Sequence, residues 1–133
     1  MPRKTVQEQK QKRPSDTKYN RIRPVLDKLI GIEDPDDLME EILSVLTKTE
    51  LVPEVGNYYI FVYFSKTPNI QYDAHPFVAV TDIFKWGFRG INFHWGQMRQ
   101  YTWDEIVGSL HLVYDNEVKD LQELPFRKIN LNS

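Results

Sequence analysis

The sequence predicts an α+β protein, in which a small antiparallel sheet bent towards a barrel is flanked by helices and preceded by a basic extended arm. Three observations predict this class. Apolar residues recur at helical spacing in the first third of the chain. Three short runs rich in β-formers then lie close together in the middle. Finally, the charge is unevenly distributed along the chain. Residues 1–23 carry eight Lys/Arg and two Asp/Glu, a net charge of +6. Residues 24–133 carry nine Lys/Arg and 17 Asp/Glu, a net charge of −8.

The length of the chain favours one domain. Of the 133 residues, about 110 follow the arm, enough for a single modest core. We therefore expect an arm over residues 1–23 and one α+β domain over residues 24–133. The sequence has no cysteine and no continuous apolar stretch typical of a secretory signal or a membrane span. We expect no disulfides and no membrane partner.

The arm is predicted to gain order only from a partner. Apart from Val6 and Tyr19, residues 1–20 hold no sizeable apolar group, so ordering them would cost backbone entropy with little burial in return. A basic segment on an acidic body is suited to binding a polyanion or an acidic protein surface, and we favour the protein surface. The predicted partner-binding residues of the arm are Arg3, Lys4, Lys10, Lys12, Arg13, Lys18, Arg21 and Arg23.

Two helices are predicted in the first third of the chain. The first spans residues 24–30, begins at a proline and is followed by Gly31, which suits a helix end. The second spans residues 35–48, because Asp34 is a good N-cap and Pro35 fits the first helical position. The apolar residues at helical spacing in the second helix are Leu38, Ile42, Val45 and Leu46.

Three strands are predicted over residues 58–64, 76–84 and 91–95. The first reads YYIFVYF, an unbroken apolar and aromatic run, which indicates burial on both faces. Gly87 and Gly90 lie between the second and third strands, and we expect them to allow a tight turn through positive φ angles. Short strands in succession favour an antiparallel meander bent towards a small barrel.

A third helix is predicted over residues 103–115. Thr102 and Glu105 have the spacing of a capping box, and apolar residues continue at helical spacing after them. The tail, Leu124–Leu131, is expected to supply a last edge strand. Its Pro125 would stand at the start of that strand, where a lost backbone donor does least harm.

Residue types that carry chemistry are sparse. Asp73, His75 and His94 would project from matching faces of extended strands, which suggests a metal or acid–base site. However, a zinc spacing such as HExxH is absent and no serine lies in a nucleophile motif. We therefore predict no catalytic residue, no metal ligand, no cofactor and no small-molecule ligand. The candidate surface site of this region comprises His75, Arg89, Asn92, His94 and Arg99.

One stretch of the chain resembles a known family. Residues Tyr72–Val78 read YDAHPFV, residues Gly87–Trp95 read GFRGINFHW, and Arg99 follows. This pattern resembles small proteins of T4-like tailed bacteriophages, especially phages of marine bacteria and cyanobacteria, in which GF-x-G-[LI]-N-[LF]-H-[YW] follows YYD-x-x-PLV. The match covers approximately residues 58–101, and the GF-x-G-x-N-x-H segment is its most specific part. The resemblance implies an SH3-like β-barrel and a virion structural protein.

The separation of charge and this resemblance together predict a non-enzymatic structural protein of a phage particle. It is expected in the tail, baseplate or neck, where it would dock onto neighbouring subunits through the basic arm and the barrel surface. The expected partners are other virion proteins in a hetero-assembly with multiple copies. The expected location is the virion, after assembly in the host cytoplasm.

Two other functions stay open at this point. A nucleic-acid-binding module would use the arm on phosphates and Trp86, Arg89 and Arg99 on bases. A small nuclease is the third hypothesis, because some SH3-like barrels of toxins cleave RNA with Arg, His or Thr side chains. His94 is the first residue to test for that activity.

Overall fold

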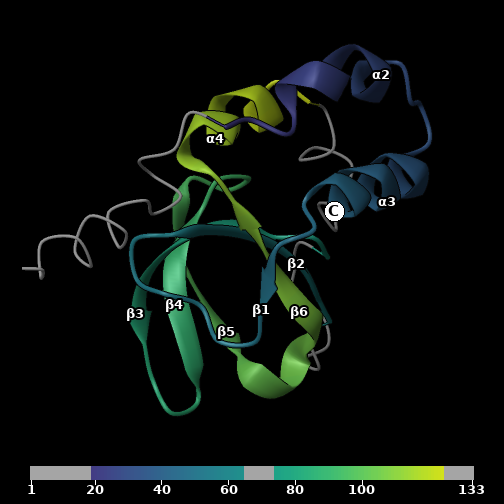
Figure 1. Cartoon of the computed structure of the whole chain (residues 1–133). Helices are drawn as coiled ribbons and strands as arrows, with labels where there is room; N and C mark the ends of the chain where they lie inside the picture. The colour runs from purple at the N-terminus through teal and green to yellow at the C-terminus, as the bar shows by residue number, and fades with distance from the viewer. Residues whose placement is uncertain (1–18, 65–73, 125–133) are drawn as a thin grey trace, which may run out of the picture.

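A computed structural model describes residues 19–64 and 74–124 (Figure 1). In these residues the structure has a six-stranded sheet with helices gathered at one end. The strands are β1 (Thr49–Glu50), β2 (Tyr58–Tyr63), β3 (Phe77–Ile83), β4 (Gly87–Asn92), β5 (Gln97–Thr102) and β6 (Ile106–Val113). The helices are α2 (Leu26–Ile30), α3 (Pro35–Val45) and α4 (Asp115–Gln122), with the 3₁₀ turns η2 (Arg23–Val25) and η3 (Trp103–Glu105). The predicted α+β class is confirmed. None of the described helices is both long and apolar enough to cross a bilayer.

The sheet is open and strongly curled. Its order is β1-β6-β2-β3-β4-β5, and all neighbouring strands are antiparallel. The Phe61 ring on β2 lies 5.3 Å from the Tyr101 ring on β5, although in a flat sheet three spacings of about 4.8 Å would separate these strands. The described strands nevertheless do not close into a barrel, so the predicted SH3-like barrel is not confirmed.

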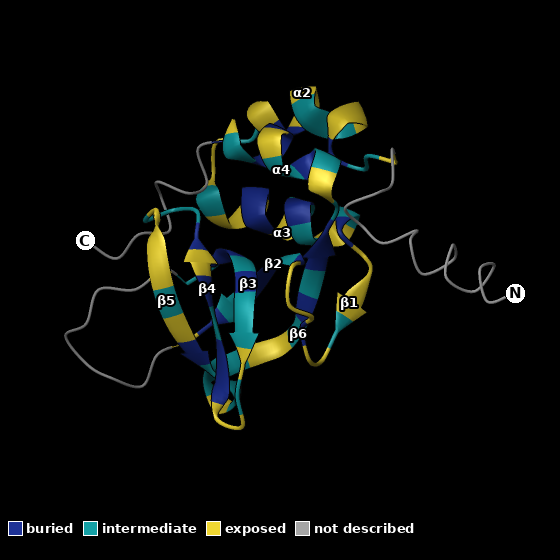
Figure 2. Cartoon of the chain, turned by 90° about the vertical axis from the view of Figure 1, so that its left-hand side faces the viewer, coloured by how far each residue is buried: buried dark blue, intermediate teal, exposed yellow. Residues whose placement is uncertain are grey.

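Two clusters of buried apolar side chains hold the layers together. The inner cluster, inside the curl of the sheet, consists of Tyr59, Phe61, Tyr63, Val78, Val80, Phe88, Tyr101, Leu110 and Leu112. The helical cluster, between the helices and the sheet, consists of Ile22, Leu29, Leu38, Met39, Ile42, Leu46, Ile60, Phe77, Val113, Leu121 and Leu124. Figure 2 shows α3, with its buried residues in dark blue, lying over the end of the sheet.

The strand β2 contributes to both clusters. Tyr59, Phe61 and Tyr63 belong to the inner cluster, and Ile60 belongs to the helical cluster. This division follows from the alternation of side chains along a strand. The prediction of a strand over residues 58–64, buried on both faces, is confirmed to within one residue.

The first two predicted helices are present. Residues 24–30 are covered by η2 and α2. The helix α3 begins at Pro35 as predicted, and the Asp34 carboxylate accepts a hydrogen bond from the Asp37 backbone N–H at 3.0 Å. The helix ends earlier than predicted, at Val45.

The predicted helix over residues 103–115 is wrong. After the single turn η3, residues 106–113 form β6 and pair with β2. The Thr102 hydroxyl does donate to the Glu105 carboxylate at 2.6 Å, but this contact belongs to one turn only. Gly108 has a φ of 79°, which is incompatible with a helix, and the register with β2 shifts beside it. In so short a run, the spacing of the apolar residues fits both the period of a helix and the period of a strand. The segment forms a strand because it pairs with β2.

The predicted strand over residues 91–95 is displaced. β4 lies nearer the N-terminus, and a turn that ends at Gly96, with a φ of 70°, leads into β5. Gly87 and Gly90, which we expect in a turn from the sequence, instead lie inside β4 without positive φ. A Cβ atom on Gly90 would lie 2.4 Å from the Ala79 carbonyl oxygen on β3, so this glycine allows two strands to approach closely.

A buried ion pair joins the start of the described chain to α4. The Arg21 guanidinium donates to both carboxylate oxygens of Glu117, at 2.8 and 2.9 Å, and the two side chains are 8% and 0% exposed. Arg21 also donates to the Leu112 carbonyl oxygen at 2.9 Å and lies 3.9 Å from the centre of the Tyr114 ring. A bidentate, stacked arginine of this kind is fixed in one geometry.

Neighbouring residues extend this contact. The Asn20 amide donates to the Asp120 carboxylate at 2.9 Å, and Arg23 pairs with the same carboxylate at 3.2 Å. The predicted arm boundary at residue 23 is therefore wrong, because Arg21 and Arg23 bind α4 of the same chain. We call Asn20, Arg21 and Arg23 with their partners on α4 the N-terminal clamp.

Three segments lie outside the described residues: 1–18, 65–73 and 125–133. The predicted tail strand is among them. So are the other predicted partner-binding residues of the arm, Arg3, Lys4, Lys10, Lys12, Arg13 and Lys18.

Replacing one partner of the clamp is expected to destabilise the fold. Glu117→Gln should lower the free energy of unfolding by about 3–5 kcal/mol, because it leaves Arg21 buried without an opposite charge. Urea unfolding at neutral pH measures this loss. As a control, Glu41→Gln removes the partner of Lys28, whose side chain is 64% exposed, and should cost about 1 kcal/mol or less. Equal losses in the two variants would contradict a stabilising clamp.

Candidate functional site

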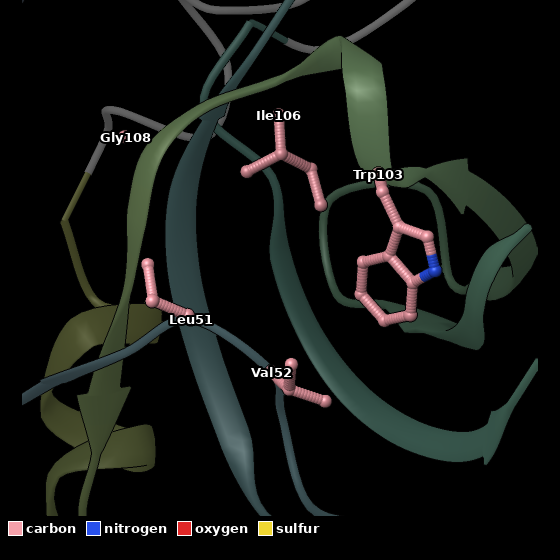
Figure 3. A pocket seen from close by; sticks show the side chains of 5 residues that line it. All are labelled: Leu51, Val52, Trp103, Ile106 and Gly108. Atoms are coloured by element: carbon pink, nitrogen blue, oxygen red, sulfur yellow. The ribbon is translucent and has the colours of Figure 1, made fainter. Parts of the chain in front are cut away.

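An open apolar hollow lies where the end of β1, η3 and the first half of β6 meet (Figure 3). It has a volume of about 350 Å³ and is lined by Leu51, Val52, Trp103, Ile106 and Gly108. The indole ring faces the two aliphatic side chains of residues 51 and 52 across it. Leu51 is 79% exposed and Val52 is 58% exposed. Exposed apolar groups gathered around a hollow are typical of docking sites.

The wall that carries Leu51 and Val52 is fixed by a tyrosine of the inner cluster. The Tyr59 hydroxyl donates to the Glu50 carboxylate at 2.6 Å and accepts the Glu54 backbone N–H at 2.9 Å. Both ends of the segment between these glutamates are thereby tied to β2. The two apolar side chains are held outward by this attachment.

The opposite wall is also attached to β2. The Trp103 indole N–H donates to the Lys85 carbonyl oxygen at 2.7 Å, and the Trp103 ring lies 5.7 Å from the Phe88 ring. The turn that carries this ring is held by Glu105, which accepts a hydrogen bond from the Tyr63 hydroxyl. Each wall of the hollow therefore depends on one tyrosine of the same strand.

Both tyrosines are held in their protonated form. Burial and the hydrogen bond to Glu105 raise the pKa of Tyr63 from 10.0 to about 12. Burial and the hydrogen bond to Glu50 also raise the pKa of Tyr59. The hydroxyls therefore remain hydrogen-bond donors through neutral and moderately alkaline pH, and the walls keep their attachment.

The surroundings of the hollow are acidic. The two segments that form its walls, residues 49–55 and 101–109, contain no Lys or Arg. Their four acidic residues are Glu50, Glu54, Asp104 and Glu105. An apolar hollow in an acidic region favours a ligand that combines apolar side chains with basic ones.

His75, a predicted surface residue, lies at a second hollow. This hollow has a volume of about 330 Å³, and α3 supplies the rest of its lining, namely Asp36, Met39, Glu40 and Leu43. The structure thus brings His75 together with the acidic first half of α3.

Arg89 belongs to a cluster on the outer face of the sheet. Its guanidinium pairs with Asp82 of β3 at 3.0 Å and lies 5.3 Å from the centre of the Phe84 ring. Hydrogen bonds from Thr81 and from Arg89 hold the pKa of Asp82 below its ordinary value. Trp86, which is 43% exposed, stacks on Phe84 with ring centres 4.9 Å apart. We call Phe84, Trp86 and Arg89 the outer-face cluster.

Asn92 is a buried structural residue instead of a surface ligand. Only 1% of it is exposed. Its amide N–H donates to the Tyr101 hydroxyl at 2.8 Å, and its oxygen accepts the backbone N–H of His94 at 2.7 Å. These contacts fix the turn between β4 and β5, and they place His94 in that turn.

The five predicted surface residues do not form one site. Asn92 and Arg89 lie three positions apart on β4, so their side chains project to opposite faces. The Arg99 guanidinium lies 5.0 Å from the centre of the Trp95 ring. The candidate site is therefore the apolar hollow, in which none of the five takes part.

Comparison of the chain with protein-family models, with curated proteins and with solved structures finds no match. Within residues 19–64 and 74–124, no group of three or more His, Cys, Asp or Glu side chains is arranged to hold a metal ion. The hollow offers apolar contact at its centre and negative charge around it. Both features suit the binding of a polypeptide segment.

Sequence reasoning misses Leu51 and Val52. They precede Pro53 in a short connection, and an apolar pair in such a position is usually buried. Their outward placement depends on the contacts of Tyr59, which no local pattern reveals. The absence of Lys and Arg from both wall segments is a signal that the sequence does contain.

Alkaline unfolding is expected to depend on Tyr63. The folded protein keeps this phenol protonated up to about pH 12, whereas the unfolded chain releases the proton near pH 10. Its stabilising contribution is therefore complete below pH 10 and is lost as the pH rises towards 12. In Tyr63→Phe, the free energy of unfolding should fall less steeply across this range. Urea unfolding at a series of pH values measures the slope, and an unchanged slope would contradict the raised pKa.

Proposed function

We propose that this protein is a non-catalytic assembly protein of a tailed bacteriophage particle, in the tail, baseplate or neck. It docks onto neighbouring virion subunits through the basic segment 1–18 and through the surface of its sheet. The resemblance of residues 72–99 to phage structural proteins supports the kind of particle. The separation of charge between the basic segment 1–18 and the acidic remainder of the chain supports docking through that segment.

The N-terminal clamp is the observation that carries this proposal. In the clamp, Arg21 and Arg23 form ion pairs with α4 of the same chain, so we do not assign them to partner binding. Residues 1–18 precede it and carry six Lys/Arg against two Asp/Glu, a charge of +4. The described residues carry eight Lys/Arg and 16 Asp/Glu, a net charge of −8. A basic segment attached at one defined place to an acidic body is suited to reaching an acidic surface on a neighbouring subunit.

The order of the strands supports an SH3-like arrangement, which we propose for the sheet. In such a barrel a meander of four strands is followed by a 3₁₀ turn and by a fifth strand that pairs with the first. The elements β2 to β5, η3 and β6 follow one another in this order, and β6 pairs with β2. The curl also brings the Tyr101 ring of β5 to 5.1 Å from the Tyr63 ring of β2.

Removing residues 1–18 is expected to abolish incorporation while leaving the body folded, because Tyr19 and the clamp are kept. A tagged copy of the truncated protein is expressed in infected host cells beside the wild type, and mass spectrometry of purified particles measures its content. A full-length variant with the six Lys/Arg of this segment replaced by Gln is the matched control for charge and should be lost as well. Incorporation equal to that of a tagged full-length copy would refute the proposal.

A nucleic-acid-binding module is the second candidate function, and the outer-face cluster favours it. Exposed rings such as Trp86 stack on bases, with about 1–3 kcal/mol for each base. Segment 1–18 would supply the contacts to phosphates. The charge of −8 on the described residues opposes this function, so we place it second.

Titration of labelled DNA and RNA at two salt concentrations separates the two functions. If the protein docks on protein surfaces, no affinity is expected even at low salt. A steeply salt-dependent affinity that is weakened by Trp86→Ala and by the Gln-substituted segment would establish nucleic-acid binding instead. The same mixtures test the nuclease hypothesis. Cleavage of the DNA or RNA by the wild type, but not by His94→Ala, would establish it.

A further inference from the structure

The apolar hollow adjoins a part of the β6 edge with which no described strand pairs. β6 spans Ile106–Val113, but β1 pairs with it only at Leu110 and His111. Along residues 106–109, no strand among the described residues pairs with that edge of β6. Ile106 and Gly108 of this half-edge line the hollow itself. An unpaired edge beside an apolar hollow is the arrangement to which an extended segment adds as a further strand.

The C-terminal tail has the composition that this surface requires. Residues 125–133 read PFRKINLNS and contain no Asp or Glu. Arg127 and Lys128 match the acidic wall segments, which lack Lys and Arg. The tail also carries three apolar side chains, Phe126, Ile129 and Leu131. Segment 1–18, by contrast, has Val6 as its one branched aliphatic residue, so it fills an apolar hollow less well.

We propose that residues 125–133 of one copy of the protein occupy the hollow and the β6 half-edge of a second copy. Alternate residues of an extended segment share a face, so Ile129 and Leu131 enter the hollow together. Arg127 lies on the same face and meets the acidic surroundings. This contact is separate from the docking proposed for segment 1–18, because it uses the other end of the chain.

A second copy fits this site better than the tail of the same chain. Leu124, the last described residue, is 1% exposed and lies in the helical cluster. Trp103 and Ile106 pack against the inner cluster, on the other side of the sheet. Figure 1 shows the helices at one end of the sheet and the turn between β5 and β6 at the other. Val113, at the other end of β6 from Ile106, belongs to the same cluster as Leu124, and the seven residue steps between Ile106 and Val113 span about 23 Å. Ile129 can lie at most about 17 Å from Leu124.

The proposed contact is heterologous, since the tail of one copy meets a different surface of the next. Contacts of this kind repeat from copy to copy and generate rings or open filaments. A protein that carries one tail and one hollow therefore assembles in a row of copies, which distinguishes it from a two-fold dimer.

Sedimentation velocity over a wide range of concentrations tests the proposal on the full chain. The wild type should associate reversibly into dimers and larger species. Removal of residues 125–133, or Leu51→Asp in the hollow, should weaken this association by about tenfold or more. Ile91→Asp is the matched control, because Ile91 is an exposed apolar residue of β4, 41% accessible, outside the hollow. It should associate as the wild type does. Circular dichroism checks that each variant is folded.

Mixing two variants gives the sharpest result. The tail-less protein keeps its hollow, and Leu51→Asp keeps its tail, so the mixture should form a one-to-one pair and nothing larger. A wild type that is monomeric at every concentration would overturn the proposal. So would association that survives removal of the tail, which would point to segment 1–18 as the occupant. Removal of residues 1–18 should leave self-association intact, so failure here is distinguishable from failure of the virion-docking proposal.

Discussion

The ion pair between Arg21 and Glu117 is the contact on which the rest of the structure depends. It joins residues 96 positions apart and links the first described residues to α4, the helix that follows β6. Two buried charges are tolerated only when each is fully paired, and Arg21 meets this condition through Glu117, the Leu112 carbonyl oxygen and the Tyr114 ring. The pair therefore fixes how the chain enters the helical layer and where segment 1–18 joins the body.

The strand β2 connects this fold to its proposed function. Ile60 packs under the helices, while Tyr59 and Tyr63 support the two walls of the hollow. The exposure of Leu51 and Trp103 at the hollow is thus a consequence of contacts made inside the core. The apolar hollow on an acidic body, with basic residues in segments 1–18 and 125–133, supports the docking that we propose.

Local signals in the sequence predict the elements that depend on few distant contacts. The cap at Asp34 and the unbroken apolar run of β2 are of this kind, and both predictions are confirmed. The predicted helix over residues 103–115 is wrong because Leu110 and Leu112 also fit the period of a strand, and pairing with β2 decides between the two. Arg21 resembles its basic neighbours in sequence, and only the fold brings it to an acid on α4. The hollow escapes prediction for the same reason, since its two walls come from distant segments.

Zero-length coupling of amines to carboxylates in the intact assembly tests the central claim most directly. A carbodiimide joins only those Lys and Asp or Glu side chains that are in contact, and mass spectrometry identifies the joined residues. Our account predicts links from Lys4, Lys10, Lys12 or Lys18 to acidic residues of a different virion protein. Links from these lysines only to acidic residues of the same chain would contradict it.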